Sequence, residues 1–432
     1  MRRTDPRREV VVVTEQPQTA RPSVWRHRDF LLLWGGQSVS ETGSAVTQLA
    51  LPLVAIVVLH ATTFEVAVLT ALVTVAFLLV SLPAGAIVDR LPKRQTMLVC
   101  DVARGLLLVS IPVAAVTGRL TMWQLYAVAL VFGVFTVVFD VAYQSYLPAV
   151  LPKALLVDGN GKLGTTASLA GIIGPGIGGA LVGLFGPAKA IIVDTASFVF
   201  SAVTLGLIRT VEPPAGRSAA RSGSMRVDIA EGLSFVTRHR ILRKVVACTG
   251  TYNFFSSFVA ATETIFLIRI IRVTPATLGI VFAAMGAGGV VGGLVSGRLS
   301  KRVGSARIIW VSVAGLGWTN LLMPLAQPGW RIWLFVAGAA GSSAGSVIYN
   351  TAQVSYRQAI TPPALLGRMN ASVRWIVWGT MPLGALVGGA LATRFGVRTT
   401  IWAGAAGCWA AALWVVLSPL LRMRDFDADE IA

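Results

Sequence analysis

Charged residues are scarce in this 432-residue chain. Asp, Glu, Lys and Arg together make up 13% of the sequence, whereas apolar residues make up 55%. Soluble globular proteins carry about 25% charged residues. The shortage therefore excludes a soluble globular protein, and a mean hydropathy of +0.72 indicates a chain that lies in a lipid bilayer.

Cysteine and histidine are rarer still, with three residues of each. Cys100, Cys248 and Cys408 are far apart in apolar stretches, a placement typical of packed, reduced thiols rather than of a disulfide or a metal site. The sequence also lacks a Walker-type phosphate loop and a recognisable nucleophile with its base. We therefore expect no enzyme activity, no bound metal and no cofactor.

The chain does contain a succession of apolar runs of about 20 residues, the length that an α-helix needs to cross a hydrocarbon core of about 30 Å. Isolated strands would leave backbone groups unsatisfied in lipid, so each run is predicted to be a helix. We predict an all-α integral membrane protein with about twelve transmembrane helices. The predicted spans are 30–59, 65–88, 96–117, 121–147, 165–185, 188–208, 241–268, 277–297, 305–326, 331–353, 371–393 and 399–421.

The basic residues are distributed unevenly between the two ends of these helices. If the N-terminus is cytoplasmic, 29 of the 37 Lys and Arg residues lie on the cytoplasmic side, seven lie on the outer side, and Arg104 lies within a helix. This bias follows the positive-inside rule, so we predict that both termini are cytoplasmic. The net charge of +18 would then face anionic lipid, and we expect no nucleic-acid partner.

Two distant parts of the chain repeat each other. GAIVDRLPKR at 85–94 returns as GLVSGRLSKR at 293–302, and SYLPAVLPKALLVDGN at 145–160 returns as SYRQAITPPALLGRMN at 355–370. The similar offsets indicate a duplication, and therefore two six-helix pseudo-repeats in parallel topology. Paired halves of this kind place a substrate site at their interface near the bilayer midplane and expose it alternately to each side.

The duplication divides the chain into segments. The region that joins the halves is polar and contains Pro, Gly and Arg, a composition typical of a loop. The predicted segments are a mostly disordered cytoplasmic leader at 1–28, an N-terminal half at 29–209, a cytoplasmic loop at 210–240, a C-terminal half at 241–421 and a cytoplasmic tail at 422–432.

The repeated loop also carries a family resemblance. It is similar to the signature G-x-x-x-D-R-x-G-R-R of the major facilitator superfamily, with Pro92 in place of the second glycine. The matching residues are Gly85, Asp89, Arg90, Lys93 and Arg94. FDVAYQSYLP, IIGPGIGG and GRMNA resemble the branch that exports macrolides and enterobactin-type siderophores. The resemblance implies a monomeric transporter of small molecules in the bacterial cytoplasmic (inner or plasma) membrane.

Asp89 stands apart in that loop because its charge is negative. Lys93 and Arg94 are explained by topology alone, but Asp89 is not. A carboxylate at a helix end can pair with a neighbouring arginine or face the N-terminus of another helix. The resemblance implies that Asp89 latches the two halves in the outward-open state by meeting the start of the eleventh helix, near 367–370. The second half has Gly297 at the equivalent position, which favours a one-sided latch.

Three more charged residues lie inside neighbouring predicted helices. Asp101 and Arg104 share one face of the third helix, and Asp140 lies about two turns from the end of the fourth. A buried charge is costly without a partner, so we predict one cytoplasmic ion network that joins them to Asp89 and Arg90. The alternative is a structural pairing without a part in the transport cycle.

Glu41 lies about 11 residues, or some 16 Å, into the first predicted helix and hence near the midplane. A carboxylate there can bind and release a proton if desolvation raises its pKa. We predict that Glu41 couples proton entry to export. Two alternatives stay open: a cavity carboxylate that selects cationic substrates, and one that is hydrogen-bonded to Gln37 or Gln48.

Two carboxylates and several polar residues complete the candidates. Asp194 and Glu263 are predicted nearer the outer side, where solvation is expected, and Glu263 is a candidate partner of Arg269. Six polar or aromatic residues are candidate liners of the substrate cavity, with contacts between helices as the alternative. They are Gln37, Tyr143, Gln144, Asn253, Asn320 and Tyr349.

The stretch GIIGPGIGG at 171–179 places small residues and a proline on the fifth predicted helix, a pattern typical of close helix packing and a kink. It resembles the exporter signature G-x8-G-x3-G-P-x2-G-G, with Ala170 in place of one glycine. The matching residues are Gly161, Gly174, Pro175, Gly178 and Gly179. The resemblance implies export rather than uptake.

These observations favour a secondary active efflux transporter that moves amphiphilic small molecules, antibiotic or siderophore-like, by alternating access and proton antiport. The proton gradient would be its energy source. Many drug exporters of the superfamily carry an arginine on the fourth helix, which this chain lacks; Arg104 would replace it, or coupling would run through carboxylates alone. The alternatives are a proton-coupled uptake symporter and a non-transporting membrane sensor with the same fold.

Overall fold

The computed structural model describes residues 23–88, 91–152, 155–210, 212, 225–362 and 365–426. This described part is helical and strand-free, and it contains twelve helices long and apolar enough to cross a membrane. The predicted all-α membrane fold is therefore confirmed. The first helices are α1 (Arg28–Leu53, continued by a π-helical turn at Val54–Val58), α2 (Thr63–Val88), α3 (Lys93–Val116), α4 (Met122–Val150), α5 (Leu156–Phe185), α6 (Pro187–Leu207) and α7 (Met225–Arg238). The later ones are α8 (Leu242–Ile265), α9 (Pro275–Val303), α10 (Arg307–Gly317), α11 (Ile332–Ile360), α12 (Leu366–Phe395), α13 (Val397–Ala410) and α14 (Ala412–Val416).

In each half, one glycine ends a long helix, and the two glycines occupy equivalent positions of the duplication. Gly186 separates α5 from α6 with φ +83°, and Gly396 separates α12 from α13 with φ +90°. Only glycine adopts such a backbone conformation without steric cost. One residue is therefore enough to reverse the chain at the two places that the duplication makes equivalent.

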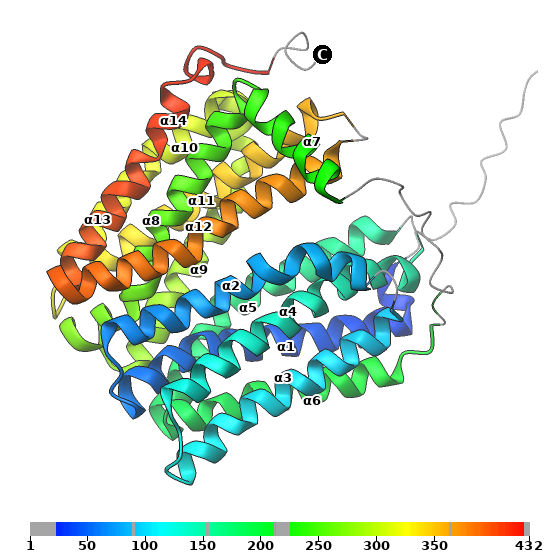
Figure 1. Ribbon diagram of the computed structural model, residues 1–432, viewed down its shortest axis with the longest axis vertical. Coiled ribbons are helices and arrows are strands. Elements are labelled where there is room, and N and C mark those ends of the chain that lie inside the picture. The colour runs from blue at the N-terminus through cyan, green and yellow to red at the C-terminus, as the bar shows by residue number, and fades with distance from the viewer. Residues whose placement is uncertain are drawn as a thin grey trace, which may run out of the picture.

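The helices form two bundles, α1–α6 and α8–α14, that meet mainly through two pairs of helices (Figure 1). One pair is α5 with α9, and the other is α2 with α12. The duplication makes these pairs equivalent, because α5 corresponds to α12 and α2 corresponds to α9. We call the end of the bundles that carries α7 and both ends of the described chain the terminal face, and the other end the opposite face.

The two halves touch at the opposite face and diverge toward the terminal face (Figure 1). A Cβ on Gly179 of α5 would lie 2.6 Å from the carbonyl oxygen of Pro275 at the start of α9. A Cβ on Gly161 or Gly297, nearer the terminal face, would meet no atom within 4 Å. The contact between α5 and α9 therefore closes the opposite face and ends before the terminal face.

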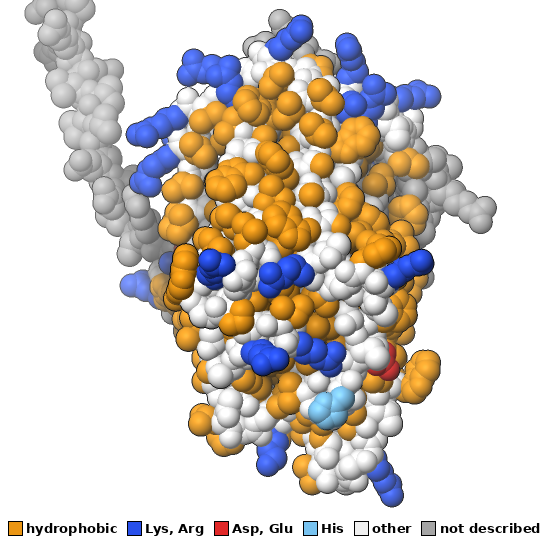
Figure 2. Space-filling view, turned by 90° about the vertical axis from the view of Figure 1, so that its left-hand side faces the viewer, with side chains coloured by type: hydrophobic (Ala, Val, Ile, Leu, Met, Phe, Trp, Pro, Cys, Tyr) orange, Lys and Arg blue, Asp and Glu red, His pale blue; other side chains and the backbone are white. Residues whose placement is uncertain are grey.

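Large apolar side chains cover the outside of both bundles. Leu106 and Leu294, for example, are 65% and 71% exposed. Figure 2 shows a broad apolar surface on which Lys and Arg side chains stand in groups and acidic side chains are nearly absent from the face in view. Apolar exposure on this scale marks a surface that faces lipid rather than water.

Part of the joining segment predicted as a loop is helical. In α7, Gly232 and Val236 are buried one turn apart on one face, a spacing that lets a helix pack on the C-terminal half. Glu231 forms an ion pair with Arg368 of α12. A Cβ on Gly232 would lie 2.6 Å from the Arg368 carbonyl oxygen. The end of the joining segment is therefore fixed to α12.

The described part of the tail docks on the turn between α9 and α10. The Ala306 N–H donates to the Arg424 carbonyl oxygen at 3.1 Å, and the Ser305 N–H donates to the Asp425 carboxylate at 2.8 Å. Gly304 has φ +111°, and a Cβ there would lie 2.1 Å from the same Arg424 oxygen. The glycine therefore permits both the turn and the close approach of the tail.

Candidate functional site

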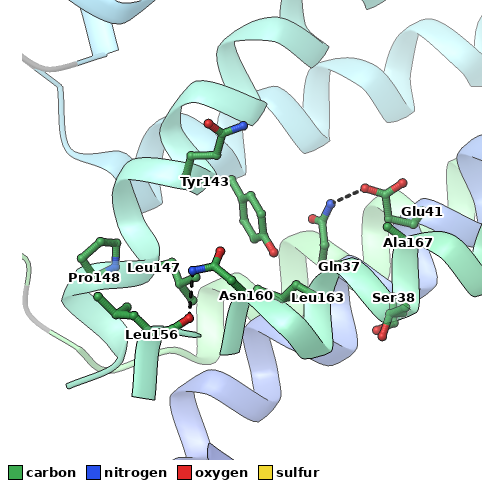
Figure 3. A pocket seen from close by; sticks show the side chains of 13 residues that line it. Gln37, Ser38, Glu41, Tyr143, Leu147, Pro148, Leu156, Asn160, Leu163 and Ala167 are labelled. Carbon is green, nitrogen blue, oxygen red and sulfur yellow. Dashed lines mark hydrogen bonds between the residues drawn. The ribbon is translucent and has the colours of Figure 1, made fainter. Parts of the chain in front are cut away.

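A cavity of about 500 Å³ lies within the N-terminal half, bounded by α1, α4 and α5 (Figure 3). Its wall combines a carboxylate, several amides and hydroxyls, and apolar side chains. The lining residues are Gln37, Ser38, Glu41, Tyr143, Gln144, Leu147, Pro148, Leu156, Asn160, Leu163, Gly164, Thr166 and Ala167. Such a mixture suits an amphiphilic small molecule, because apolar contact supplies affinity and a few polar groups fix orientation.

Glu41 lies on this wall and accepts a hydrogen bond from Gln37. The distance from Gln37 Nε2 to Glu41 Oε1 is 2.9 Å. The two residues are four apart in α1, so their side chains share one face of the helix. Figure 3 shows both side chains on the cavity side of α1. Of the two hydrogen-bond partners considered for Glu41, the structure selects Gln37.

Tyr143 of α4 lies on the facing wall. Its ring stacks on Phe139 with centroids 6.2 Å apart, and its hydroxyl points into the space between Gln37 and Asn160 (Figure 3). Gln144, the next residue, also lines the cavity. Three of the six predicted cavity liners, Gln37, Tyr143 and Gln144, therefore meet in one place.

The other three predicted liners lie elsewhere, in the C-terminal half. Asn253 donates to the Val377 carbonyl at 3.2 Å, and the buried Asn320 donates to the Gly317 carbonyl at 2.9 Å. Tyr349 is buried and lies 2.8 Å from the Thr249 hydroxyl. Asn253 and Tyr349 thus bond between helices, the alternative considered for them, because a polar group in a lipid-embedded bundle needs a partner. The Asn320 bond stays within one helical segment, and Tyr349 also lines a second, smaller cavity in the C-terminal half.

Asp101 and Arg104 form a buried ion pair on α3, as their spacing indicated. The Arg104 guanidinium lies 4.2 Å from the Phe139 ring centroid and 4.4 Å from that of Phe198. Both ring faces attract the cation. Arg104 is thus enclosed by one carboxylate and two aromatic rings.

Asp140 connects this pair to the cavity and to the other half. It lies within range of charge interaction with Arg104, Glu41 and Arg374. Arg374 belongs to α12, is exposed, and stacks at 4.6 Å over the Trp378 ring. Sequence reasoning counted Arg374 only among the cytoplasmic-side charges, although an arginine beside tryptophans within an apolar span was a signal for a functional group.

The predicted latch residues Asp89 and Arg90 lie outside the described residues, and the surroundings of Gly85 and Gly367 are likewise not described. The neighbouring basic residues bond within the N-terminal half. Arg94 Nε donates to the Leu205 carbonyl at 2.8 Å, and Lys93 Nζ donates to the Val88 carbonyl at 2.6 Å.

Glu212 is a residue that sequence reasoning missed. Its carboxylate accepts from the backbone N–H groups of Lys93 and Arg94 at 2.7 and 2.6 Å. These are unsatisfied donors at the start of α3, where an anion is favoured. Only the fold brings Glu212 to that place, because 118 positions separate it from Arg94.

The two carboxylates expected near the outer side need correction. Asp194 is 0% exposed, because α1 packs directly over α6 there: a Cβ on Gly43 would lie 2.6 Å from Asp194 Oδ1. Glu263 is half-buried and forms no ion pair with Arg269 among the described residues. The Arg269 guanidinium instead donates to the Ala61 carbonyl at 2.7 Å, across the boundary between the halves.

Three of the exporter-signature glycines lie in close contacts between helices. A Cβ on Gly174 would lie 2.4 Å from the Ala45 Cβ, and one on Gly178 would lie 3.2 Å from the Val46 Cα. These two glycines face α1, Gly179 faces α9, and Gly161 meets no neighbour. The prediction that residues 171–179 form a close-packing surface agrees with the structure.

Twelve membrane-spanning helices in two equivalent halves, with a cavity of mixed polar and apolar lining in the N-terminal half, are typical of a transporter rather than an enzyme. The particular family follows from sequence comparison. The model of the transmembrane secretion effector family, a branch of the major facilitator superfamily, matches residues 20–432, so the chain belongs to that family.

Two of the relatives that the chain resembles over most of its length are named as efflux proteins. The multidrug efflux pump Tap of Mycolicibacterium fortuitum is 24% identical over 366 residues, covering 82% of this chain and 86% of that protein. Macrolide efflux protein A of Streptococcus pyogenes is 22% identical over 373 residues, covering 85% and 90%. The chain is thus a member of an efflux transporter family.

Solved structures share the fold. The nucleoside transporter NupG has a TM-score of 0.70 at 12% identity, covering 91% of this chain and 99% of that one. A bacterial homologue of the iron transporter ferroportin in an inward-facing state also has a TM-score of 0.70, at 15% identity, covering 92% and 99%. At these identities the likeness concerns the fold alone.

Proposed function

We propose that this protein exports amphiphilic small molecules, antibiotic or siderophore-like, by proton antiport, and that Glu41 carries the coupling proton. The observation that carries the proposal is the place of Glu41 on the wall of the cavity. A carboxylate that lines a substrate cavity can hold either a proton or a cationic group of the substrate. Competition between the two is the simplest form of antiport.

The charges around Glu41 support this role. The Asp140 carboxylate interacts electrostatically with Glu41, and also with Arg104 and Arg374. Arg374 belongs to the C-terminal half, so the strength of its interaction with Asp140 depends on how the halves are arranged. A change of that arrangement would alter the electrostatic field around Asp140 and its neighbour Glu41.

The direction of access follows from the bias of basic residues. The terminal face carries most of the Lys and Arg, so we place it in the cytoplasm, with both termini. The arrangement in Figure 1, closed at the opposite face, is then the inward-open state of an alternating-access cycle. Loading from the cytoplasm in this state is the first step of export.

The substrate class rests on the cavity and on the relatives. The wall places apolar Leu147 and Leu163 beside polar Gln37, Asn160 and Glu41. Relatives named for multidrug and macrolide efflux make a macrolide our first choice, and the Glu41 carboxylate on the cavity wall favours a substrate with a cationic group. We place the protein as a monomer in the bacterial cytoplasmic membrane.

The test is accumulation of macrolides, other amphiphilic antibiotics and iron chelators in an efflux-deficient bacterium that expresses the chain, with and without a protonophore. We expect lowered accumulation of at least one compound, abolished by the protonophore and by Glu41→Gln. Glu65→Gln is the matched control, because Glu65 caps α2 through Thr62, away from the cavity, and glutamine can keep that cap.

Other outcomes discriminate the remaining functions. Accumulation raised above that of cells without the protein would indicate uptake, and flux of no compound would favour a sensor. Export that persists in the presence of the protonophore and in Glu41→Gln would contradict the proposal that Glu41 couples export to protons.

A further inference from the structure

Asp194 of α6 is a buried carboxyl that the cavity does not use. Its Oδ1 accepts a hydrogen bond from Ser197 Oγ at 2.9 Å, and its residue is 0% exposed. The hydroxyls of Ser44 and Thr47, from α1, lie beside it. The site is therefore a carboxyl with three hydroxyl groups, closed inside the contact between α1 and α6.

Two atoms of this cluster lack a hydrogen-bond partner within the described part of the chain. They are Asp194 Oδ2 and Thr47 Oγ1, and both are buried. Thr47 is 5% exposed, so water does not satisfy its hydroxyl from outside. Buried polar groups without partners are rare, and each requires an explanation.

The nearby cation does not neutralise Asp194. Arg104 of α3 is the charged group whose field reaches Asp194. Its guanidinium is already paired with Asp101 and enclosed by Phe139 and Phe198. An ionised Asp194 would therefore be a buried charge without a partner of its own, which is strongly unfavourable.

A hydrogen bond between Asp194 Oδ2 and Thr47 Oγ1 would satisfy both atoms, with the Thr47 hydroxyl donating to a carboxylate or a protonated Oδ2 donating to Thr47. Only the protonated form also removes the buried charge. A divalent metal ion would need about six or more oxygen ligands, and the cluster offers one carboxyl and three hydroxyls. We propose that Asp194 is a proton-binding site, protonated on Oδ2 and hydrogen-bonded to Thr47 in this conformation.

Protonation of Asp194 would affect the packing of α1 against α6. A Cβ on Gly43 would lie 2.4 Å from Ser197 Oγ, so α1 and α6 touch closely around Asp194. Glu41 lies on the cavity side of the same helix, and Gly43 and Thr47 lie on its α6 side. A proton on Asp194 therefore stabilises the packing of the helix that carries Glu41. This inference does not depend on the substrate or on proton coupling at Glu41.

Infrared spectroscopy of the full-length protein in lipid nanodiscs tests the proposal, because a protonated carboxylic acid has a carbonyl band separate from the bands of a carboxylate. We expect Asp194→Asn to remove one protonated-acid band at neutral pH. Thr47→Val should keep that band but move it to higher frequency, because the hydrogen bond to Thr47 is lost. Glu65→Gln is the control, because Glu65 is a hydrogen-bonded acid at the start of α2 and should leave the protonated-acid region unchanged.

Three other results would overturn the proposal. Loss of a carboxylate band in Asp194→Asn, with the protonated-acid region intact, would show that Asp194 is ionised and overturn the proposal. A sodium-dependent shift in the wild type that Asp194→Asn lacks would assign the site to a metal cation instead. If Asp194→Asn fails to fold, an unmoved band in Thr47→Val overturns the proposal by itself.

Discussion

Gly179 of α5 and Gly279 of α9 meet across the boundary between the halves with no space for a side chain. A Cβ on Gly179 would lie 2.9 Å from Gly279 Cα, and a Cβ on Gly279 would lie 3.0 Å from Gly179 Cα. Gly389, the duplicate of Gly179, has the same relation to α2, where its Cβ would lie 2.3 Å from the Ala67 Cβ. Small residues of this kind allow helix backbones to approach closely in a membrane. The exporter-signature residue Gly179 therefore belongs to the contact that closes the opposite face.

A side chain at Gly179 should prevent that closure. We expect Gly179→Val to abolish efflux, because its Cβ would meet the backbone of Pro275 and Gly279 rather than a movable side chain. Gly183→Val, one turn further along α5, is the matched control, since a Cβ there meets no atom within 4 Å. Efflux assays on both variants, normalised to membrane expression, measure the difference. Equal activity of the two would show that the contact is not needed for transport.

The ion pair of Asp101 and Arg104 should be strongly coupled. Removal of either partner leaves a buried charge, so we expect Asp101→Asn or Arg104→Gln alone to lower the free energy of unfolding by about 3–5 kcal/mol. The double variant should cost less than the sum of the two, because it leaves no lone charge. Thermal unfolding in detergent gives this comparison. Additive losses would mean that the two side chains act independently.

Glu212 should stabilise the start of α3. We expect Glu212→Ala to lower the free energy of unfolding by about 0.5–2 kcal/mol, the range for loss of a helix N-terminal cap, because two N–H groups lose their acceptor. Hydrogen exchange at Lys93 and Arg94 should rise locally. Asp158→Ala is the control, an exposed acid in the first turn of α5. Unchanged exchange at Lys93 would contradict the cap.

The docking of the tail should resist mild acid. The Ser305 N–H donates to Asp425 and holds the pKa of that carboxyl below its ordinary value. A lowered folded-state pKa means that the stabilisation is present above the unfolded-state pKa and is lost as the pH falls through the lowered one. Digestion of the tail by a carboxypeptidase should therefore stay slow from neutral to mildly acidic pH. Asp425→Asn should be digested faster throughout that range, and a tail equally resistant in this variant would refute the role of the charge.

The local contacts of the candidate site were predictable, and the long-range contacts were not. The spacing of Gln37 and Glu41 indicated their hydrogen bond, and the spacing of Asp101 and Arg104 indicated their ion pair, because residues three or four apart share a helix face. The neighbours of Asp194 could not be read in this way. Its depth along α6 was compatible with solvent or with burial, and the packing of α1 over α6 decided for burial.

The sequence by itself determined the twelve spans, their duplication and the close-packing role of the glycine-rich stretch, because hydrophobic length, repeated motifs and residue size act locally along the chain. Only the tertiary structure decided that Gln37, Glu41 and Tyr143 share one cavity, that Glu212 caps α3, and that the halves meet at the opposite face. Those relations join helices that are far apart in sequence. They depend on which side of each helix faces its neighbour, and in lipid that choice is made by side-chain packing between helices rather than by the hydrophobicity of any one of them.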